Sequence, residues 1–556
     1  MKEKYIIGLD YGTLSARAVL VRVSDGTELA DSVWPYAHGA LEETLPDGTV
    51  LPPDFALELP EDYEEALIRT IRGVLNKAQV PADDVIAIGL DVTSATFLPV
   101  RDGKPLSTDP VFMGNPHAYL KLWKHHAAQE QAIRITELAG KRGERFLDNC
   151  GRIVNSEWML PKLLEIYEKA PEVWEHTDNF MEAGDWLVYL LTGNMTRCLC
   201  QAGYKLLWNE TDGYPSEDFL NALAPGFGRM TEKLQGKEVR VGEEAGKLSP
   251  EMAEKLGLRA GISVAAACID AHVAVPSVSI DGPGKALLIL GTSCCMVLCS
   301  EKKAFVPGIS GCVKDAVLPG LYGYEAGQSA VGDIFDWYVT QAVPAYIEKE
   351  AEAEGIGVHA YLSRLAGKLK PGESGLLALD WWNGNRSCLA DANLSGLLLG
   401  LRLSTKPEEI YRALLESTAY GMRAILDEFE ERGVTVSELY ACGGIVKKNP
   451  LMMQIYADVL KHEIRVAASP YASSLGAAIY AAVAAGTEAG GYPDLFAAAR
   501  AMGRTEPYTY VPDPAASQTY DRLYAAYHRL HDHFGKGGDA VMKKLLALKQ
   551  DKNGEE

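Results

Sequence analysis

Several features that would place this chain in a familiar class of nucleotide-binding protein are missing from its 556 residues. There is no GxxxxGK[ST] stretch, so a Walker-type phosphate loop is excluded. No GxGxxG follows the first apolar run, which argues against a dinucleotide site of the Rossmann type. A nucleotide would therefore have to be bound by other backbone and side-chain groups.

Cysteine is scattered, and no pattern of metal ligands is present. The chain has 10 cysteines, but it has no pair of CxxC motifs and no Cys/His group with zinc spacing. Cys268 and Cys299 lie in apolar runs, where thiols usually act as small buried hydrophobes. Cys198 and Cys200 form the closest pair, without further ligands beside them. We expect neither a disulfide framework nor a structural metal.

Long hydrophobic runs and positive charge are also in short supply. The N-terminal sequence MKEKYIIGLDYG has no signal-peptide apolar stretch, and segments 265–268 and 286–299 are too short or too interrupted to cross a bilayer. The formal net charge of −21 disfavours nucleic acid and anionic membrane surfaces as partners. We expect a soluble, cytoplasmic protein in which ATP would need local amides, a lysine or a metal ion.

The length and the distribution of turn residues predict two domains. A chain of 556 residues exceeds what one hydrophobic core usually supports. The segment PSVSIDGPG, residues 276–284, concentrates turn formers. We therefore predict an N-terminal domain at 1–279 and a C-terminal domain at 280–556, the latter ending in a charged helical appendage.

Both predicted halves open with the same local plan. An apolar strand runs into Asp10-Tyr11-Gly12-Thr13 and a second strand follows; Lys285–Leu290 likewise runs into Gly291-Thr292-Ser293 and then into Cys294–Leu298. Strands alternating with helices indicate α/β layers. The expected helices include 60–78, 407–432, 450–460 and 474–485, and an apolar strand is expected at 85–90.

The two turns could bind phosphate. Glycine lets the backbone approach a phosphate closely, hydroxyls and amides donate hydrogen bonds, and a carboxylate can hold Mg²⁺. An ordinary hairpin favours the same residues and explains the first turn equally well when it is taken alone. A second turn of the same chemistry favours the phosphate interpretation. The residues concerned are Asp10, Gly12, Thr13, Ser15, Gly291, Thr292 and Ser293.

A third glycine-rich piece follows a strand in the C-terminal half. Gly443 and Gly444 would let the chain lie against an adenine or ribose, and Asn449 precedes the next helix; a helix cap is the alternative. Three pieces in this order are the layout of actin-like ATPases. The predicted fold is therefore α/β, with two actin-like ATPase (ribonuclease H-like) domains and an interdomain cleft.

Two long stretches carry a family resemblance that extends over roughly the whole chain. MLPKLLEIYEKAPEVWEHTDNFMEAGDWLVYLLTG (159–193) and SGLLLGLRLSTKPEEIYRALLEST (395–418) resemble characteristic regions of the FGGY family of carbohydrate kinases. Within the family, GLDYGTLSARAVL, GLDVTSATFLPV, CIDAHVAVP and ACGGIVKKNPLMMQIYADVL are most similar to members that act on ribulose. The resemblance implies phosphorylation of L-ribulose, or also D-ribulose, by ATP with Mg²⁺ to ribulose 5-phosphate, as a step of L-arabinose catabolism.

The resemblance also implies roles for individual residues. Asp270 matches the family's catalytic aspartate, which would accept the proton of the sugar hydroxyl; an N-cap aspartate after a strand is the alternative. Mg²⁺ would lie at Asp10 and Asp270. The implied sugar contacts, besides Asp270, are Ala95, Thr96, Trp123, Lys205 and Glu325.

The sequence departs from the family pattern at one position, and three alternative functions stay open. His125 stands where the family usually has aspartate, which alters substrate preference if that position touches sugar and means little if it pairs locally. The chain could instead phosphorylate another polyol such as xylulose or glycerol. It could be an actin-like ATPase without a sugar substrate, or a non-catalytic sugar-binding regulator. The sequence leaves the oligomeric state open, with a homodimer as one option.

Overall fold

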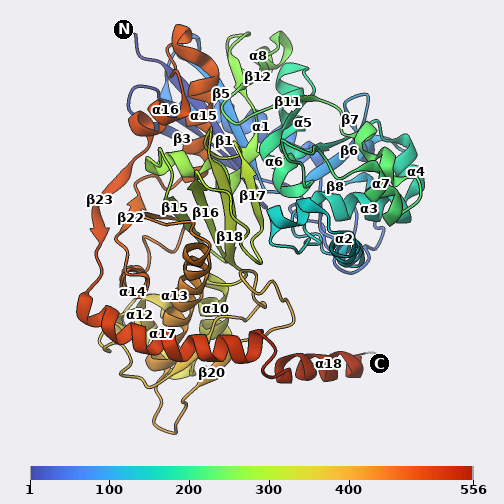
Figure 1. The fold of residues 1–556 in the computed structure, drawn as a ribbon. Helices are drawn as coiled ribbons and strands as arrows, with labels where there is room; N and C mark the ends of the chain where they lie inside the picture. Colours follow the sequence, from blue (N-terminus) through green and yellow to red (C-terminus); the bar gives the residue numbers. More distant parts are fainter. Residues whose placement is uncertain (1, 554–556) are drawn as a thin grey trace. The chain divides into compact units, whose positions relative to one another are not determined.

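The computed structural model describes residues 2–553, which form two units (Figure 1). The first unit comprises the chain up to Pro283 together with Gly311–Gly323 and Tyr471–Arg504. The second comprises Gly284–Ser310, Tyr324–Pro470 and the chain from Thr505 onward. Each unit is built from mixed sheets and helices, so the predicted α/β class with two actin-like halves is confirmed.

The sheet of the first unit has the strand order β12 (Glu244–Lys247), β13 (Ser263–Ala265), β5 (Val85–Val92), β1 (Tyr5–Tyr11), β2 (Ser15–Arg22), β3 (Glu28–Pro35), and β14 (Cys268–Ile269) also pairs with β5. β2 is antiparallel to β1, whereas β5 is parallel to β1, β13 and β14. Every residue of β1 and β5 is buried. Because β1, β5 and β14 run in the same direction, their carboxyl ends meet at one edge of the sheet.

A smaller sheet of the first unit has the order β4 (Leu57–Glu58), β8 (Leu120–Lys121), β6 (Phe97–Arg101), β7 (Lys104–Pro105), with β9 (Asn179–Glu182) paired to β6. A separate apolar core lies between it and the neighbouring helices. The helices of this unit before residue 284 are α1 (Pro60–Ala78), α2 (Gln129–Arg142), α3 (Met159–Lys169), α4 (Pro171–His176), α5 (Ala183–Thr192), α6 (Leu199–Lys205), α7 (Glu217–Leu223), α8 (Pro250–Leu256) and α9 (Asp270–Val273). Two further strands, β10 (Thr196–Cys198) and β11 (Lys237–Val239), pair in parallel.

The first unit also takes in two segments from later in the chain. The segment 311–323 carries β17 (Gly311–Lys314), and the segment 471–504 carries α15 (Ala472–Ala489) and α16 (Leu495–Met502). α15 lies against β1 and β5 with almost no space between backbones. A Cβ added to Gly8 would lie 1.9 Å from the Ser474 carbonyl oxygen, and one added to Gly89 would lie 2.0 Å from that of Ala477. The prediction of a single division at 279/280 did not anticipate this return, because the alanine-rich sequence of α15 does not indicate which sheet it covers.

The second unit contains the strand order β18 (Tyr322–Gln328), β16 (Cys294–Ser300), β15 (Lys285–Leu290), β21 (Glu438–Cys442), β22 (Ile464–Ala467), β23 (Thr505–Tyr510). A hairpin of β19 (Leu377–Leu379) and β20 (Leu397–Leu399) lies outside this sheet. Its helices are α10 (Gly332–Trp337), α11 (Ala345–Ala353), α12 (Val358–Ala366), α13 (Pro407–Glu431), α14 (Pro450–Leu460), α17 (Pro514–Gly535) and α18 (Val541–Asn553).

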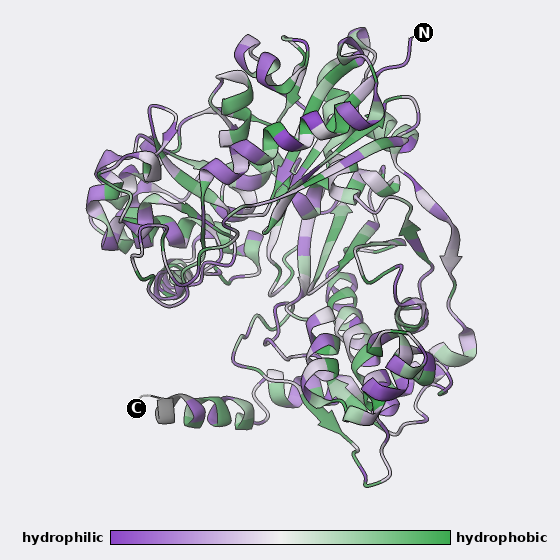
Figure 2. Ribbon diagram, turned by 180° about the vertical axis from the view of Figure 1, so that it is seen from behind, coloured by the Kyte–Doolittle hydropathy of each residue, from purple (hydrophilic) through white to green (hydrophobic). Residues whose placement is uncertain are grey.

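The hydropathy of the elements follows their positions. In Figure 2 the strands are mostly hydrophobic, whereas many helices carry both hydrophilic and hydrophobic residues, as amphipathic helices do. The expected helices at 60–78, 407–432 and 450–460 correspond to α1, α13 and α14. Within the described residues, none of the helices has the length and apolarity required for a membrane span.

Candidate functional site

Three aspartates gather at the carboxyl edge of the first unit's main sheet. Asp10 at the end of β1 is the register partner of Asp91 on β5, and Asp270 begins α9 directly after β14. Asp91 is fully buried. Burial raises the pKa of its carboxyl well above the usual range, and the neighbouring negative charges of Asp10 and Asp270 raise it further. This edge of the sheet therefore concentrates negative charge that only a cation or protons can balance.

Asp10 has a partial counter-charge. Burial raises the pKa of its carboxyl, while the guanidinium of Arg17, with Nη1 3.4 Å from Oδ2, opposes that rise. Among the described residues no three His, Cys, Asp or Glu side chains form a ready-made metal-ligand group. Mg²⁺ usually takes only one or two carboxylates together with phosphate oxygens and water, so Asp10 and Asp91 fit this ion when phosphate is present.

The turn after β1 is connected to residues predicted to contact sugar. The backbone N–H of Gly12 donates to the Ser15 carbonyl oxygen at 3.1 Å, which closes the turn. The Thr13 hydroxyl accepts a hydrogen bond from the indole Nε1 of Trp123 at 3.0 Å. A residue predicted to contact phosphate and a residue predicted to contact sugar are therefore in direct contact.

Trp123 is fixed at its backbone as well. Its N–H donates to the Thr96 hydroxyl at 3.2 Å, and the Thr96 and Thr93 hydroxyls lie 2.8 Å apart. Thr96 is fully buried, and Ala95 is buried in a left-handed backbone conformation with φ 53°. We call Thr13, Thr93, Thr96 and Trp123 the Thr–Trp group, because hydrogen bonds join Trp123 to the loops that follow β1 and β5.

The remaining predicted sugar and catalytic residues lie in both units. Lys205 ends α6 and is almost fully buried, with its ammonium 5.7 Å from the centre of the Trp158 ring. Asp270 is half-buried, and its carboxylate accepts a hydrogen bond from the Ala271 N–H at 2.7 Å. Glu325 lies on β18 in the second unit, where its carbonyl oxygen accepts from the Ser310 N–H. The first unit thus holds all of these residues except Glu325.

His125 is an interior residue that pairs locally. Its Nε2 lies 2.9 Å from a Glu165 carboxylate oxygen and 3.2 Å from the ammonium of Lys121, and its Nδ1 accepts a hydrogen bond from the Ala56 N–H. Burial and the Lys121 charge lower the pKa of the imidazole to about 3, so the ring is neutral. The departure from the family's usual aspartate therefore has a local structural explanation.

The second unit contains a pocket of about 450 Å³. It begins at the turn after β15, where Gly291 and Thr292 line it, and continues along the segment between β21 and α14, where Gly444 and Asn449 line it. These are four of the residues predicted to bind nucleotide. Ser293 and Gly443 belong to the same turns but are not among the lining residues. A pocket of this volume is of the size that holds a small-molecule ligand.

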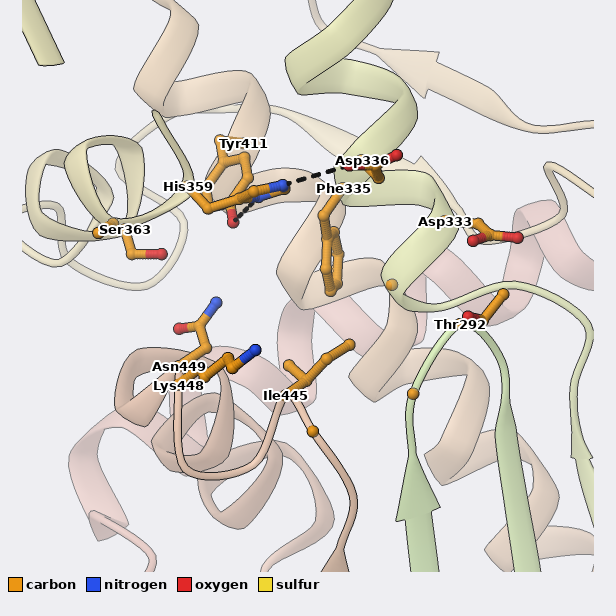
Figure 3. A pocket seen from close by; sticks show the side chains of 14 residues that line it. Thr292, Asp333, Phe335, Asp336, His359, Ser363, Tyr411, Ile445, Lys448 and Asn449 are labelled. Carbon is orange, nitrogen blue, oxygen red and sulfur yellow. Dashed lines mark hydrogen bonds and ion pairs between the residues drawn. The ribbon is translucent and has the colours of Figure 1, made fainter. Parts of the chain in front are cut away.

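Figure 3 shows the side chains that line the pocket. Phe335 and His359 lie on one side, and Ile445, Lys448 and Asn449 lie on the opposite side. The Nδ1 of His359 lies 3.2 Å from the hydroxyl of Tyr411, another lining residue. The pocket therefore combines apolar side chains such as Phe335 and Ile445 with polar and charged ones, including Asp333 and Asp336.

Two polar side chains at the start of α14 are available to a ligand. The Asn449 Oδ1 accepts from the Met452 N–H at 3.1 Å and so caps α14, which leaves the amide Nδ2 as its remaining donor. Lys448 forms no ion pair with any residue that the structure describes, whereas its neighbour Lys447 pairs with Glu506 at 2.6 Å. Lys448 is thus the cation available to a ligand in this part of the pocket.

Glycine is present at positions 443 and 444 for different structural reasons. Gly443 has φ 109°, and a Cβ there would lie 2.2 Å from the Leu290 carbonyl oxygen, so this position requires glycine. A Cβ on Gly444 would meet nothing within 4 Å. Gly443 therefore brings β21 close to β15, while Gly444 faces open space in the pocket.

The sequence-based prediction missed several residues of these sites. Asp91 ends an apolar strand as Asp10 does, so its signal was present in DVTS but was not used. Lys448 could not be distinguished from Lys447, because only the fold shows which side chain faces the pocket. Phe335 and His359 reach the pocket from helices distant in sequence and carry no local signal.

Comparison with known proteins gives a consistent family assignment. Residues 5–276 match the N-terminal domain of the FGGY family of carbohydrate kinases, and residues 286–485 match its C-terminal domain. The chain belongs to the FGGY family of carbohydrate kinases. As an FGGY kinase it transfers phosphate from ATP to a carbohydrate.

FGGY kinases with high similarity to the chain include two ribulokinases. That of Geobacillus thermodenitrificans is 51% identical over 553 residues, covering 99% of this chain and 98% of the relative. That of Halalkalibacterium halodurans is 52% identical over 552 residues, with the same coverage. The crystal structure of gluconate kinase from Lactobacillus acidophilus has a TM-score of 0.80 at 18% identity, covering 96% of this chain and 99% of that one, and it supports the fold alone.

Proposed function

We propose that the protein is a ribulokinase, which transfers the γ-phosphoryl group of ATP to L-ribulose and yields L-ribulose 5-phosphate. The observation that carries the proposal is identity above 50% to ribulokinases over almost the entire chain. D-ribulose is a second candidate substrate. The use of ATP and the proposed role in L-arabinose catabolism favour a cytoplasmic location.

In this proposal Asp270 accepts the proton of the sugar hydroxyl as that oxygen attacks the γ-phosphorus. A positioned carboxylate orients the hydroxyl and takes its proton, which accelerates such reactions by about 10²- to 10⁴-fold. The position of Asp270 supports this role, because it begins a helix at the edge where Asp10 and Asp91 also lie. The bond from the γ-phosphorus to the leaving oxygen breaks, and ADP leaves.

Asp10 and Asp270, joined by Asp91, are the residues that would hold Mg²⁺. The ion would neutralise phosphate charge, which is the chemistry it supplies in phosphoryl transfer. The support from this chain is the accumulation of buried carboxylates, since burial and mutual repulsion favour protonation of Asp91 unless a cation is near.

The pocket of the second unit would hold the nucleoside. Phe335 and Ile445 supply apolar walls, the amide of Asn449 supplies a hydrogen-bond donor, and Lys448 supplies positive charge for phosphate. The turn Gly291–Ser293 would lie along the phosphates, as Gly12, Thr13 and Ser15 would in the first unit. A local cation is needed because the protein as a whole carries a formal charge of −21.

The sugar would contact residues of the first unit around the Thr–Trp group. Trp123 provides a flat apolar surface for the carbon face of the sugar, Ala95 and Thr96 provide the adjoining loop, and Lys205 provides a charged donor. Glu325 of the second unit is the further proposed contact. The N-terminal domain at 1–279 would thus bind sugar and carry the catalytic aspartate, and the C-terminal domain at 280–556 would bind nucleotide.

The direct test is a coupled assay of ADP release with Mg·ATP. The acceptors are L-ribulose, D-ribulose, D-xylulose, ribitol and glycerol, with a blank that contains no sugar. We expect the highest kcat/KM with L-ribulose. Higher turnover of xylulose or glycerol would overturn the proposed substrate but leave the family assignment intact. Equal turnover in the blank would indicate an ATPase without a sugar acceptor. Light scattering on the same preparation tests the homodimer.

A further inference from the structure

Lys162 on α3 is a buried lysine with an unusual set of partners. Its side chain is fully buried. Its ammonium donates to three backbone carbonyl oxygens: Leu122 at 2.7 Å, Ala95 at 3.1 Å and Trp123 at 3.4 Å. It forms no ion pair with a carboxylate in the part of the chain that the structure describes. All three N–H donors of the ammonium are thus used on backbone acceptors.

A charged Lys162 side chain at this buried position lowers the stability of the folded protein. Burial of an ammonium without a carboxylate partner is unfavourable, and it lowers the pKa of Lys162 to about 7. A methionine of similar length would fill the same space without the desolvation cost. A lysine at this position is better explained by what its three hydrogen bonds hold in place than by a contribution to folding.

The three carbonyls belong to two loops that carry three of the proposed sugar contacts, Ala95, Thr96 and Trp123. One loop contains Ala95, whose φ of 53° is unfavourable for a residue with a Cβ and needs external support. The other contains Leu122 and Trp123. The Trp123 N–H donates to the Thr96 hydroxyl of the first loop, and its indole donates to Thr13 after β1. The ammonium of Lys162 therefore lies where these two loops are joined.

We propose that Lys162 is a positioning residue of the sugar site, which holds the loop at Ala95 and the loop at Trp123 in the register that the sugar requires. It acts through these backbone groups and does not itself take part in the chemistry. The assignment rests on the proposed function, because Ala95 and Trp123 are sugar contacts only in that proposal.

Lys121 provides a matched control. It is equally buried and also lies in the first unit, on β8. Its ammonium is directed elsewhere: it lies 3.2 Å from a Glu165 carboxylate oxygen, 3.2 Å from His125 Nε2 and 4.6 Å from the centre of the Phe55 ring. Replacing it removes a buried charge and a contact with His125, but no hydrogen bond to the carbonyls of Ala95, Leu122 or Trp123.

The experiment compares Lys162→Met and Lys121→Met with the wild type by steady-state kinetics and peptide-resolved hydrogen exchange. For Lys162→Met we expect the KM for L-ribulose to rise by at least about 10-fold, since two loop anchors lose charge-assisted hydrogen bonds. The KM for ATP should stay within about twofold. Amide exchange should accelerate in the peptides covering 93–98 and 120–125. Lys121→Met should lower the thermal midpoint yet leave sugar KM and exchange at 93–98 near wild-type values.

Two results would overturn the proposal: wild-type sugar KM and exchange in Lys162→Met, or the same changes in Lys121→Met. If Lys162→Met does not fold, Lys162→Gln is measured instead. Its uncharged amide is shorter and has only two N–H donors, so it cannot donate to all three carbonyls, and unchanged sugar KM and loop exchange would again overturn the assignment. Wild-type enzyme that fails to phosphorylate ribulose would instead refute the proposed function. Loop exchange would still report whether Lys162 holds the two loops.

Discussion

The two hairpins that open the main sheets have the same topology but end in different chemistry. In the first unit β1 is antiparallel to β2 and parallel to β5; in the second β15 is antiparallel to β16 and parallel to β21. Near the carboxyl edge the first pair of parallel strands carries Asp10 and Asp91, each one residue before its strand ends, while the second pair ends at Leu290 and Cys442, with Gly443 directly after. One edge thus presents buried acids, and the other presents close-packed backbone beside a pocket.

In the proposed function the two edges would serve different parts of the phosphoryl transfer. Carboxylates can bind a cation or accept a proton, whereas glycines allow close approach of a ligand or a neighbouring strand. In the first unit the acids cluster despite mutual repulsion, which is unfavourable for folding alone. In the second, Lys448 lines the pocket and forms no ion pair with any described residue, so it is available for a ligand. Four predictions would break or sharpen this contrast.

The largest effect is expected for Asp270→Asn, at the acidic edge. The amide cannot accept the proton of the sugar hydroxyl, so kcat should fall by about 10³-fold, within the range for a lost general base. Isothermal titration should show that both substrates still bind. Near-normal turnover with both ligands bound would remove Asp270 from its assigned role and would leave the contrast between the two edges without a catalytic meaning.

The next largest effect is expected for Gly443→Ala, at the close-packed edge. A Cβ at φ 109° and 2.2 Å from the Leu290 carbonyl should force β21 away from β15 and destabilise the second unit by about 2–4 kcal/mol. Gly12→Ala is the matched change at the first edge, where the nearest atom to the added Cβ is 3.5 Å away. It should lower stability by less than about 1 kcal/mol. Equal losses of unfolding free energy in the two variants, measured by urea unfolding, would contradict the proposed difference between the two edges.

A smaller effect is expected for Lys448→Met in the pocket. Loss of its charge should raise the KM for ATP by about 10-fold, since one charge-assisted hydrogen bond to phosphate is worth about 1.5–3 kcal/mol. The KM for ribulose should not change. Lys447→Met is the control, because that side chain pairs with Glu506 and the Ala468 carbonyl instead. If the control raises the KM for ATP as much, the pocket assignment of Lys448 is wrong.

The smallest effect concerns buried carboxyl groups to which the proposed chemistry assigns no role. Glu58 on β4 is buried and accepts a hydrogen bond from the Tyr63 hydroxyl at 2.6 Å; burial raises its pKa to about 8. Burial also raises the pKa of the Glu416 carboxyl in the second unit, but the Arg412 guanidinium, 2.8 Å away, opposes that rise. Because folded Glu58 retains a proton that the unfolded chain releases above about pH 4.5, stability should fall as pH rises from about 5 to 8.

The slope should be at most about 1.4 kcal/mol per pH unit for this one group. Glu58→Gln cannot titrate and should flatten the decrease of the thermal midpoint over that interval, measured at intervals of half a pH unit. Glu416→Gln serves as the comparison. A pH profile for Glu58→Gln that is as steep as that of the wild type would show that Glu58 is ionised in the folded protein.

Much of the architecture could be predicted from local sequence. The helix expected at 60–78 is α1, because its apolar residues recur at helical spacing and Pro60 occupies the first turn. The two strand–turn–strand units were visible because apolar runs stop at Asp10 and Gly291. The acidic site was partly visible for the same reason, since an acid that ends a buried strand stands out from its neighbours.

Sequence alone thus determined the α/β class, the repeated hairpin and the identity of residues at strand ends, because these depend on periodicity and short-range motifs. The family followed from the resemblance of long stretches of the chain to known members. Only the tertiary structure decided that α15 returns to the first unit, that Asp91 is the register partner of Asp10, and that Lys448 rather than Lys447 faces the pocket. It also decided that Lys162 binds three carbonyls far from it in sequence. Such contacts depend on packing between segments that are distant in sequence. No local sequence pattern therefore indicates which side chain will face a given site.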